Sequence, residues 1–116
     1  MTQRPQGFRE FWPIYLRAHR DKRCRRLHFV GSTGALLGLV LAFVRLDLLW
    51  FLAGMVFAYA MAWTGHFVFE RNRPATFGNP VWSLLGDIRM YLLWLSGRLA
   101  PALNAAEQTG PGHPGL

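Results

Sequence analysis

Two long segments of the chain carry no acidic or basic side chain, and polar, basic segments flank them. The longer one, 48–69, follows a brief charged interruption at 45–47. Its ~22 residues would form a helix of roughly 33 Å, enough to cross a hydrocarbon core of about 30 Å. The pattern therefore predicts a transmembrane helix over 48–69.

The earlier uncharged segment predicts a second transmembrane helix, over 28–44. Its ~17 residues are at the lower length limit for a membrane span. Its small residues recur at a spacing that favours close packing against another helix. They are Gly31, Gly34 and Gly38. Together the two segments predict a helical hairpin, joined at Arg45-Leu46-Asp47, with both ends on one side of the membrane.

Two other interpretations of the hairpin are less consistent with the sequence. A cleaved signal peptide is excluded, because about 27 polar residues precede the first apolar segment and no small-residue cleavage site follows it cleanly. The helices could instead be a buried pair in a soluble protein. However, a chain of 116 residues leaves little sequence to cover them.

The remaining segments predict shorter helices outside the hairpin. The aromatic, amphipathic segment 8–16 predicts a helix that continues to residue 19. The apolar positions of 81–99 recur at helical spacing, but Asp87 and Arg89 would be costly at a bilayer centre. We expect this helix, ending at Pro101, to lie at the interface, with a third membrane helix as the alternative. The predicted fold is thus all-α, with one membrane-embedded domain over 1–103 and a disordered Gly/Pro-rich tail over 104–116.

Composition and charge indicate which partner the chain binds and how it is oriented. The net charge is +7, yet charged residues are only 16% and hydrophobic residues 52%. Nucleic-acid-binding proteins are rich in charge as well as basic, so we expect a membrane partner and no nucleic acid. The basic residues before the first helix and after the second place both chain ends in the cytoplasm by the positive-inside rule. The single cysteine, Cys24, excludes an intramolecular disulfide, and in its basic, flexible-looking segment we interpret it as a bystander.

Three histidines are the candidate ligands of a metal site. His28 opens the first predicted helix and His66 lies near the end of the second, so the hairpin returns both to similar depth. His19 lies on the same side, and Glu70 follows His66 by four residues, on the same face of an α-helix. Imidazole suits iron, zinc and copper, and two or three histidines with a carboxylate suit non-haem Fe(II). The alternative is an interfacial His66 beside a Glu70 paired with surface arginines.

Four sequence elements resemble one family. They are Phe11-Trp12-Pro13-Ile14-Tyr15-Leu16-Arg17-Ala18-His19, Arg25-Arg26-Leu27-His28-Phe29-Val30-Gly31-Ser32-Thr33, Ala62-Trp63-Thr64-Gly65-His66-Phe67-Val68-Phe69-Glu70-Arg71-Asn72-Arg73-Pro74-Ala75-Thr76-Phe77, and Pro80-Val81-Trp82-Ser83-Leu84-Leu85-Gly86-Asp87-Ile88-Arg89-Met90. This pattern, over roughly residues 8–95, resembles the yeast-type 2-hydroxy fatty acid dioxygenase family, long regarded as a membrane domain of unknown function. One departure is Cys24, where the family pattern leads us to expect Asn.

The resemblance implies an integral membrane enzyme that uses Fe(II) and O2 to shorten 2-hydroxy fatty acids by one carbon, in α-oxidation. The family's functional histidines match His19, His28 and His66, which are expected to be both catalytic and metal-binding. We add Glu70 to the expected metal ligands. Basic residues could attract the substrate carboxylate. The candidates are Arg25, Arg26 and Arg89.

The Arg-rich composition, with Lys22 as the only lysine, indicates a bacterial source. We therefore expect the inner membrane as the location, where eukaryotic relatives would lie in the endoplasmic reticulum. Two alternatives stay open: another metal-dependent lipid-modifying enzyme, and a non-enzymatic membrane scaffold or accessory protein. A hairpin this small buries little of its own surface, which leaves a homodimer as an open alternative.

Overall fold

The computed structural model describes residues 5–74 and 77–108, and all regular structure within these ranges is helical. This confirms the predicted all-α class. The chain divides into two compact units. One comprises Asp21–Pro74, and the other combines Met1–Arg20 with Ala75–Leu116.

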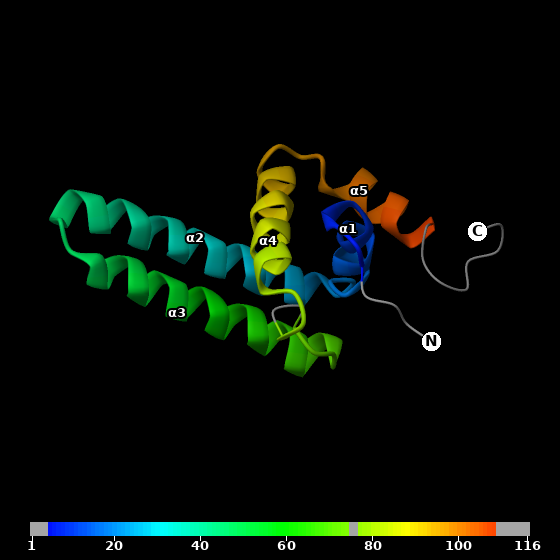
Figure 1. Cartoon of the computed structure of the whole chain (residues 1–116), viewed down its shortest axis with the longest axis horizontal. Helices are drawn as coiled ribbons and strands as arrows, with labels where there is room; N and C mark the ends of the chain where they lie inside the picture. The colour runs from blue at the N-terminus through cyan, green and yellow to red at the C-terminus, as the bar shows by residue number, and fades with distance from the viewer. Residues whose placement is uncertain (1–4, 75–76, 109–116) are drawn as a thin grey trace. The chain divides into compact units, whose positions relative to one another are not determined.

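The unit formed by Asp21–Pro74 is the predicted helical hairpin. Helices α2 (Lys22–Arg45) and α3 (Leu48–Thr64) run side by side in opposite directions (Figure 1). Their connection is only two residues long. Leu46 adopts the left-handed conformation (φ 52°) that ends α2, and the Asp47 side chain accepts a hydrogen bond from Leu49 N at 3.0 Å to begin α3.

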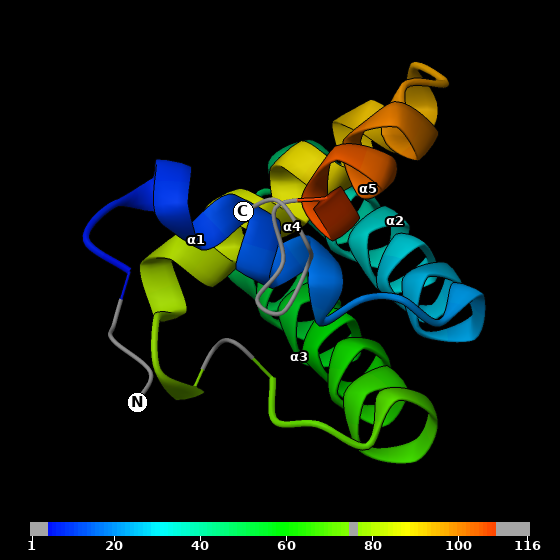
Figure 2. The same ribbon diagram turned by 90° about the vertical axis from the view of Figure 1, so that its right-hand side faces the viewer.

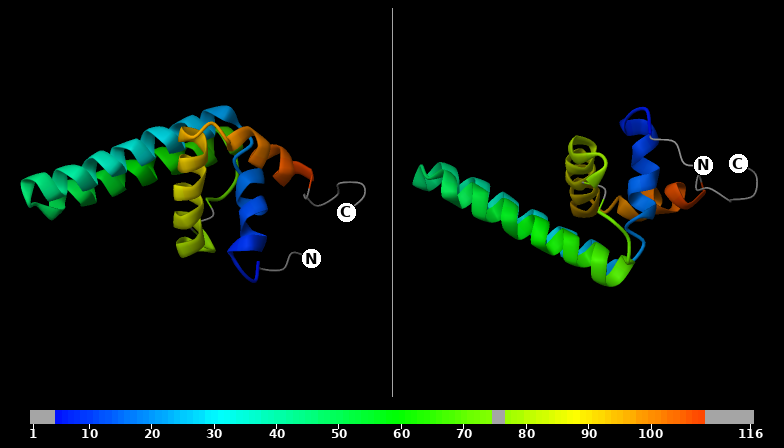
Figure 3. Two further views of the ribbon diagram at one scale, coloured as in Figure 1. Left: turned by 90° about the horizontal axis from the view of Figure 1, so that it is seen from above. Right: turned by 60° about the horizontal axis from the view of Figure 1, so that its bottom comes forward.

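Small residues allow the two helices to approach closely. The ribbons of α2 and α3 run alongside each other in both views of Figure 3. A Cβ atom placed on Gly38 would lie 2.6 Å from the backbone oxygen of Trp50, and one on Gly54 would lie 3.0 Å from the oxygen of Gly34. Any side chain at Gly38 would therefore force the helices apart. The glycine spacing seen in the sequence thus marks the contact between the helices.

Helix α2 begins six residues before the expected start at 28, so the basic segment that follows Asp21 is helical rather than flexible. Asp21 explains the early start. Its carboxylate accepts a hydrogen bond from Arg23 N at 2.8 Å, which satisfies one of the free amides of the first turn. Hydrogen bonds from Arg23 also lower the pKa of the Asp21 carboxyl group. The consequence is that Cys24 and His28 occupy one continuous helix, one turn apart.

The second arm of the hairpin changes its helical geometry near its end. After Thr64 the chain continues as a π-helix, η1 (Gly65–Glu70), which ends at Arg71 in the left-handed conformation (φ 57°). The expected helix over 48–69 is therefore present, but its last turn is π-helical rather than α-helical. Such π-turns often occur at functional sites, and this one carries His66.

Both arms are long and apolar enough to cross a membrane, at Lys22–Arg45 and Leu48–Glu70. Only 22% and 11% of their apolar windows are buried in the structure, unlike the mostly buried core helix of a soluble protein. Large exposed hydrophobic side chains cover the hairpin near its connection. They include Leu37, Phe43, Val44, Leu48, Leu49 and Val56.

The second unit consists of α1 (Phe8–Arg17), α4 (Pro80–Leu95) and α5 (Leu99–Gln108), all visible in Figure 2. Helix α1 packs against both α4 and α5. The ring of Tyr15 is almost completely buried, and Gly86 leaves room for it, since a Cβ there would lie 3.0 Å from that ring.

The C-terminal expectations need correction. The helix predicted over 81–99 ends at Leu95, because Gly97 adopts a positive φ of 74°. Pro101 does not end this helix but lies in the first turn of α5, where its missing amide is tolerated. Residues 104–108 of the predicted disordered tail belong to α5, and 109–116, with His113, lie outside the described residues.

Candidate metal centre

Three buried side chains converge at the open end of the hairpin. Cys24 and His28 come from the first two turns of α2, and His66 comes from η1. One potential ligand atom of each lies within 4.8 Å of the others. The imidazole rings of His28 and His66 meet edge to face, with their centroids 5.0 Å apart. The predicted return of His28 and His66 to one level is therefore observed.

Hydrogen bonding fixes which nitrogen of His28 can bind a metal. Its Nδ1 lies 3.0 Å from the backbone oxygen of Cys24, one helical turn earlier. A carbonyl oxygen only accepts hydrogen bonds, so in the neutral ring Nδ1 carries the proton and Nε2 carries the lone pair. This is the arrangement typical of metal-binding histidines, whose second nitrogen donates to a neighbouring oxygen.

His66 is held in the same way by the chain that follows it. Its Nδ1 donates to the side-chain oxygen of Asn72 at 2.7 Å, and Asn72 N donates back to the His66 backbone oxygen at 3.1 Å. The left-handed turn at Arg71 makes this return possible. A non-glycine residue in that conformation costs on the order of 1 kcal/mol. Asn72 therefore positions His66 with Nε2 as the unprotonated nitrogen.

Cys24 completes the group, which corrects its interpretation from the sequence as a bystander. Its Sγ lies 3.8 Å from His28 Nδ1, and its side chain is fully buried. The absence of a side chain at Gly65 leaves room for the Cys24 sulfur, because a Cβ there would lie 2.9 Å from Cys24 Sγ. The signal was present in the sequence, since Cys24 and His28 are spaced to share one face of an α-helix. It was missed because the basic segment was expected to be flexible.

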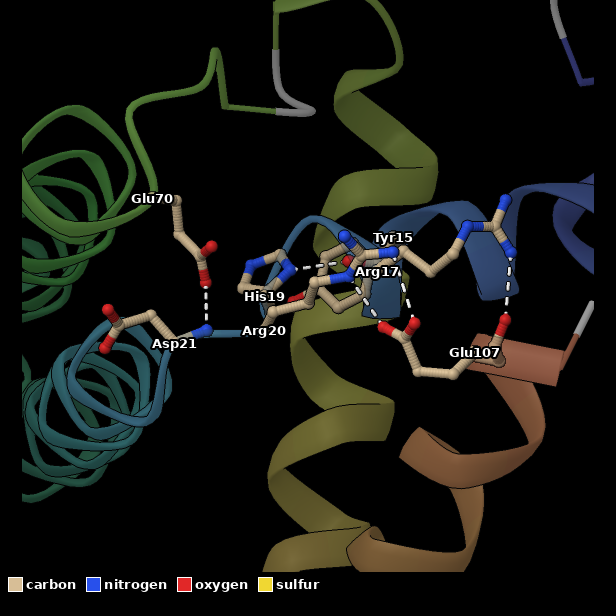
Figure 4. A network of polar contacts seen from close by, with 8 residues as sticks. Tyr15, Arg17, His19, Arg20, Asp21, Glu70 and Glu107 are labelled. Carbon is tan, nitrogen blue, oxygen red and sulfur yellow. Dashed lines mark hydrogen bonds and ion pairs between the residues drawn. The ribbon is translucent and has the colours of Figure 1, made fainter. Parts of the chain in front are cut away.

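Glu70 has a different partner from the one expected. Its Oε2 accepts a hydrogen bond from the backbone amide of Asp21 at 2.6 Å (Figure 4), which ties the end of η1 to the start of α2. The guanidinium of Arg23, 4.4 Å above the ring of Phe69, makes a second link between the same two segments. Glu70 is not part of the group of candidate ligands around His66. Its role as a metal ligand stays a prediction.

His19 belongs to the other unit and follows the end of α1. It is buried, and its Nδ1 lies 2.6 Å from the backbone oxygen of Tyr15 (Figure 4). The carbonyl again makes Nδ1 the donor and leaves the lone pair on Nε2. All three histidines matched to the family's functional residues thus share one tautomer.

The arginines expected to attract a carboxylate lie in different surroundings. Arg25 follows Cys24 directly in α2 and is half-buried, while Arg26 is exposed. Arg89 lies on α4, with its guanidinium 4.6 Å above the ring of Trp12. That cation–π contact gives Arg89 a packing role in its own unit.

One carboxyl group of the second unit has a perturbed acidity. Tyr15 Oη donates a hydrogen bond to Asp87 Oδ1. Burial raises the pKa of Asp87 to about 6, and the hydrogen bond from Tyr15 opposes this rise. In the same unit Arg20 makes a two-pronged ion pair with Glu107, at 2.6 and 3.2 Å (Figure 4).

The fold and the buried cluster define a helical protein with a cysteine–histidine site suited to a metal ion. Thiolate and imidazole ligands are compatible with iron, zinc and copper, so the donor set fits a transition metal rather than magnesium or calcium. Residues 6–99 match the family described as "2-hydroxy-palmitic acid dioxygenase Mpo1-like", and the chain belongs to this family. No curated protein and no solved structure matches the chain.

Proposed function

We propose that this chain is a membrane-embedded, Fe(II)-dependent dioxygenase that shortens 2-hydroxy fatty acids by one carbon. The observation that carries the proposal is the buried group of Cys24, His28 and His66 within the segment that matches the dioxygenase family. A bound Fe(II) would supply redox chemistry with O2 and positions for the substrate's carboxylate and 2-hydroxyl group.

His28 and His66 hold the metal through Nε2 in this proposal, and His19 supplies a third imidazole. Two observations support the role of His19. Its Nε2 carries the lone pair, as in the other two histidines. It also precedes Asp21 by only two residues, and each step along the chain spans about 3.8 Å between Cα atoms. The hydrogen bond from the Asp21 amide to Glu70 ties the start of α2 to η1.

The substrate is held by the protein's charge and by the bilayer. Arg25, one helical turn before His28, attracts the carboxylate of the fatty acid. The acyl chain lies in the membrane against the exposed apolar surface of the hairpin. The basic ends of the hairpin face the cytoplasm, the inner membrane of a bacterium being the expected location.

The proposed reaction balances with O2 as the only oxidant. The bond between C1 and C2 breaks, C1 leaves as carbon dioxide, and C2 becomes the carboxyl carbon of the shorter acid. Of the two atoms of O2 and the three oxygens of the substrate, two remain in the new acid, two leave in carbon dioxide and one leaves in water. No external reductant is required.

The test is product analysis by mass spectrometry. The protein is purified in detergent, loaded with Fe(II) without oxygen, and mixed with 2-hydroxypalmitic acid and O2. We expect the acid one carbon shorter from the wild type and its loss in His66→Ala. His113→Ala is the matched control, because it also removes one histidine and should retain activity. Equal turnover in wild type and His66→Ala would contradict the proposal.

A further inference from the structure

We propose that Cys24 is a direct ligand of the bound metal, which gives the centre a mixed sulfur and nitrogen donor set. This inference rests on the proposed function only in requiring that the site binds a metal. Cys24 Sγ belongs to the group whose potential ligand atoms lie within 4.8 Å of one another, together with His28 and His66. A metal bound by both imidazoles is therefore within reach of the sulfur.

The backbone around Cys24 is arranged to keep the sulfur in this position. Asp21 begins α2 with its side-chain cap, and this places Cys24 in the first turn. Gly65 of η1 packs directly against Cys24, since a Cβ there would lie 2.9 Å from the sulfur and 3.1 Å from Cys24 Cα. The residue that follows Gly65 is His66, so the same close approach brings both ligands together.

Cys24 also acts on the neighbouring ligand through its backbone. Its carbonyl oxygen accepts the hydrogen bond from His28 Nδ1 and so leaves the lone pair on His28 Nε2. A single residue thus offers a sulfur to the metal and fixes the tautomer of a second ligand.

Metal binding by Cys24 requires the thiolate. On binding a divalent ion, the thiol loses its proton to the solvent and a sulfur–metal bond forms, with no change in oxidation state.

X-ray absorption on the zinc-loaded full chain in detergent tests this ligand directly. Zinc–sulfur bonds are about 2.3 Å and zinc–nitrogen bonds about 2.0–2.1 Å, so the two shells are separable. We expect a shell of one sulfur in the wild type. In Cys24→Ser we expect that shell to be lost while the nitrogen shell remains. Because Cys24 is the only cysteine, the wild-type spectrum is decisive even if the variant folds poorly.

Cobalt(II) gives an independent optical readout on the same protein. Bound cobalt produces visible ligand-field bands, and a thiolate ligand adds a near-ultraviolet charge-transfer band. We expect both bands in the wild type and only the ligand-field bands in Cys24→Ser. A metal bound in the wild type with no sulfur shell and no charge-transfer band would overturn the role of Cys24 and leave the proposed function standing. No bound metal at all would overturn both.

Discussion

His66 Nδ1 donates a hydrogen bond to the side-chain oxygen of Asn72 at 2.7 Å, across the end of the π-helix. The backbone amide of Asn72 bonds the carbonyl of the same histidine. Asn72 therefore fixes both the tautomer and the orientation of one candidate ligand, through the nitrogen that does not carry the lone pair.

Asn72→Ala should weaken metal binding by about 10–100-fold, the usual cost of losing such an outer partner. Asn72→Asp keeps an acceptor and should retain most of the affinity. Competition titration with a chelator of known affinity measures the effect. Asn79→Ala is a matched control, because Asn79 makes no side-chain cap at the start of α4. Equal affinities for Asn72→Ala and the wild type would show that Asn72 does not position His66.

Gly65→Ala should damage the same site through packing. The added Cβ would lie 2.9 Å from Cys24 Sγ and 3.1 Å from Cys24 Cα, so α2 and η1 must separate. We expect a loss of about 1–3 kcal/mol in stability, as for other overpacked positions, together with weaker metal binding. Thermal unfolding and metal titration report the two effects. Gly78→Ala, with nothing within 4 Å of its added Cβ, should change neither.

Gly38→Ala tests the hairpin rather than the site. Its Cβ would meet the backbone oxygen of Trp50 at 2.6 Å, and a backbone atom cannot move aside as a flexible side chain can. We expect a lower thermal unfolding midpoint by circular dichroism in detergent. Gly7→Ala is the control, since an added Cβ meets nothing within 4 Å there. An unchanged midpoint for Gly38→Ala would mean that the two helices do not pack through this residue.

The hairpin and its glycine contact could be predicted from the sequence, because charge-free segments and small-residue spacing are local patterns. The π-turn at Gly65–Glu70 could not, since it depends on the left-handed turn at Arg71 and the return of Asn72 to His66. With α-helical periodicity over this segment, His66 and Glu70 are predicted to share one face of the helix. The structure instead groups His66 with Cys24. Likewise, the pairing of Tyr15 with Asp87 joins residues 72 positions apart and leaves no local signal.

Asp87→Asn should change the pH dependence of stability. Because burial raises the pKa of Asp87 to about 6, the folded protein binds more protons than the unfolded chain between about pH 4 and 6. Stability supplied by this group is therefore present at low pH and lost as the pH rises through that window. From pH 4 to pH 7, the difference in unfolding free energy between Asp87→Asn and the wild type should therefore change by about 1–3 kcal/mol in favour of the variant.

Denaturant unfolding of the wild type and Asp87→Asn across pH 4–8 measures this difference. Groups that titrate equally in the two proteins contribute equally to both profiles, so their effect drops out of the difference. Tyr15→Phe removes the hydroxyl that donates to Asp87 and should raise the carboxyl pKa further, which moves the window to higher pH. Parallel pH profiles for the wild type and Asp87→Asn would show that Asp87 has ordinary acidity in the folded protein.

The central claim is that the open end of the hairpin is a metal centre built on His28, His66 and Cys24. The most direct measurement is the Fe(II) bound per chain at equilibrium, after anaerobic loading and removal of free metal, in the wild type and His66→Ala. We expect one ion per wild-type chain and at least a tenfold loss of affinity in the variant, while His113→Ala binds as the wild type does. No bound iron in a folded wild-type protein, or equal binding in His66→Ala, would contradict it.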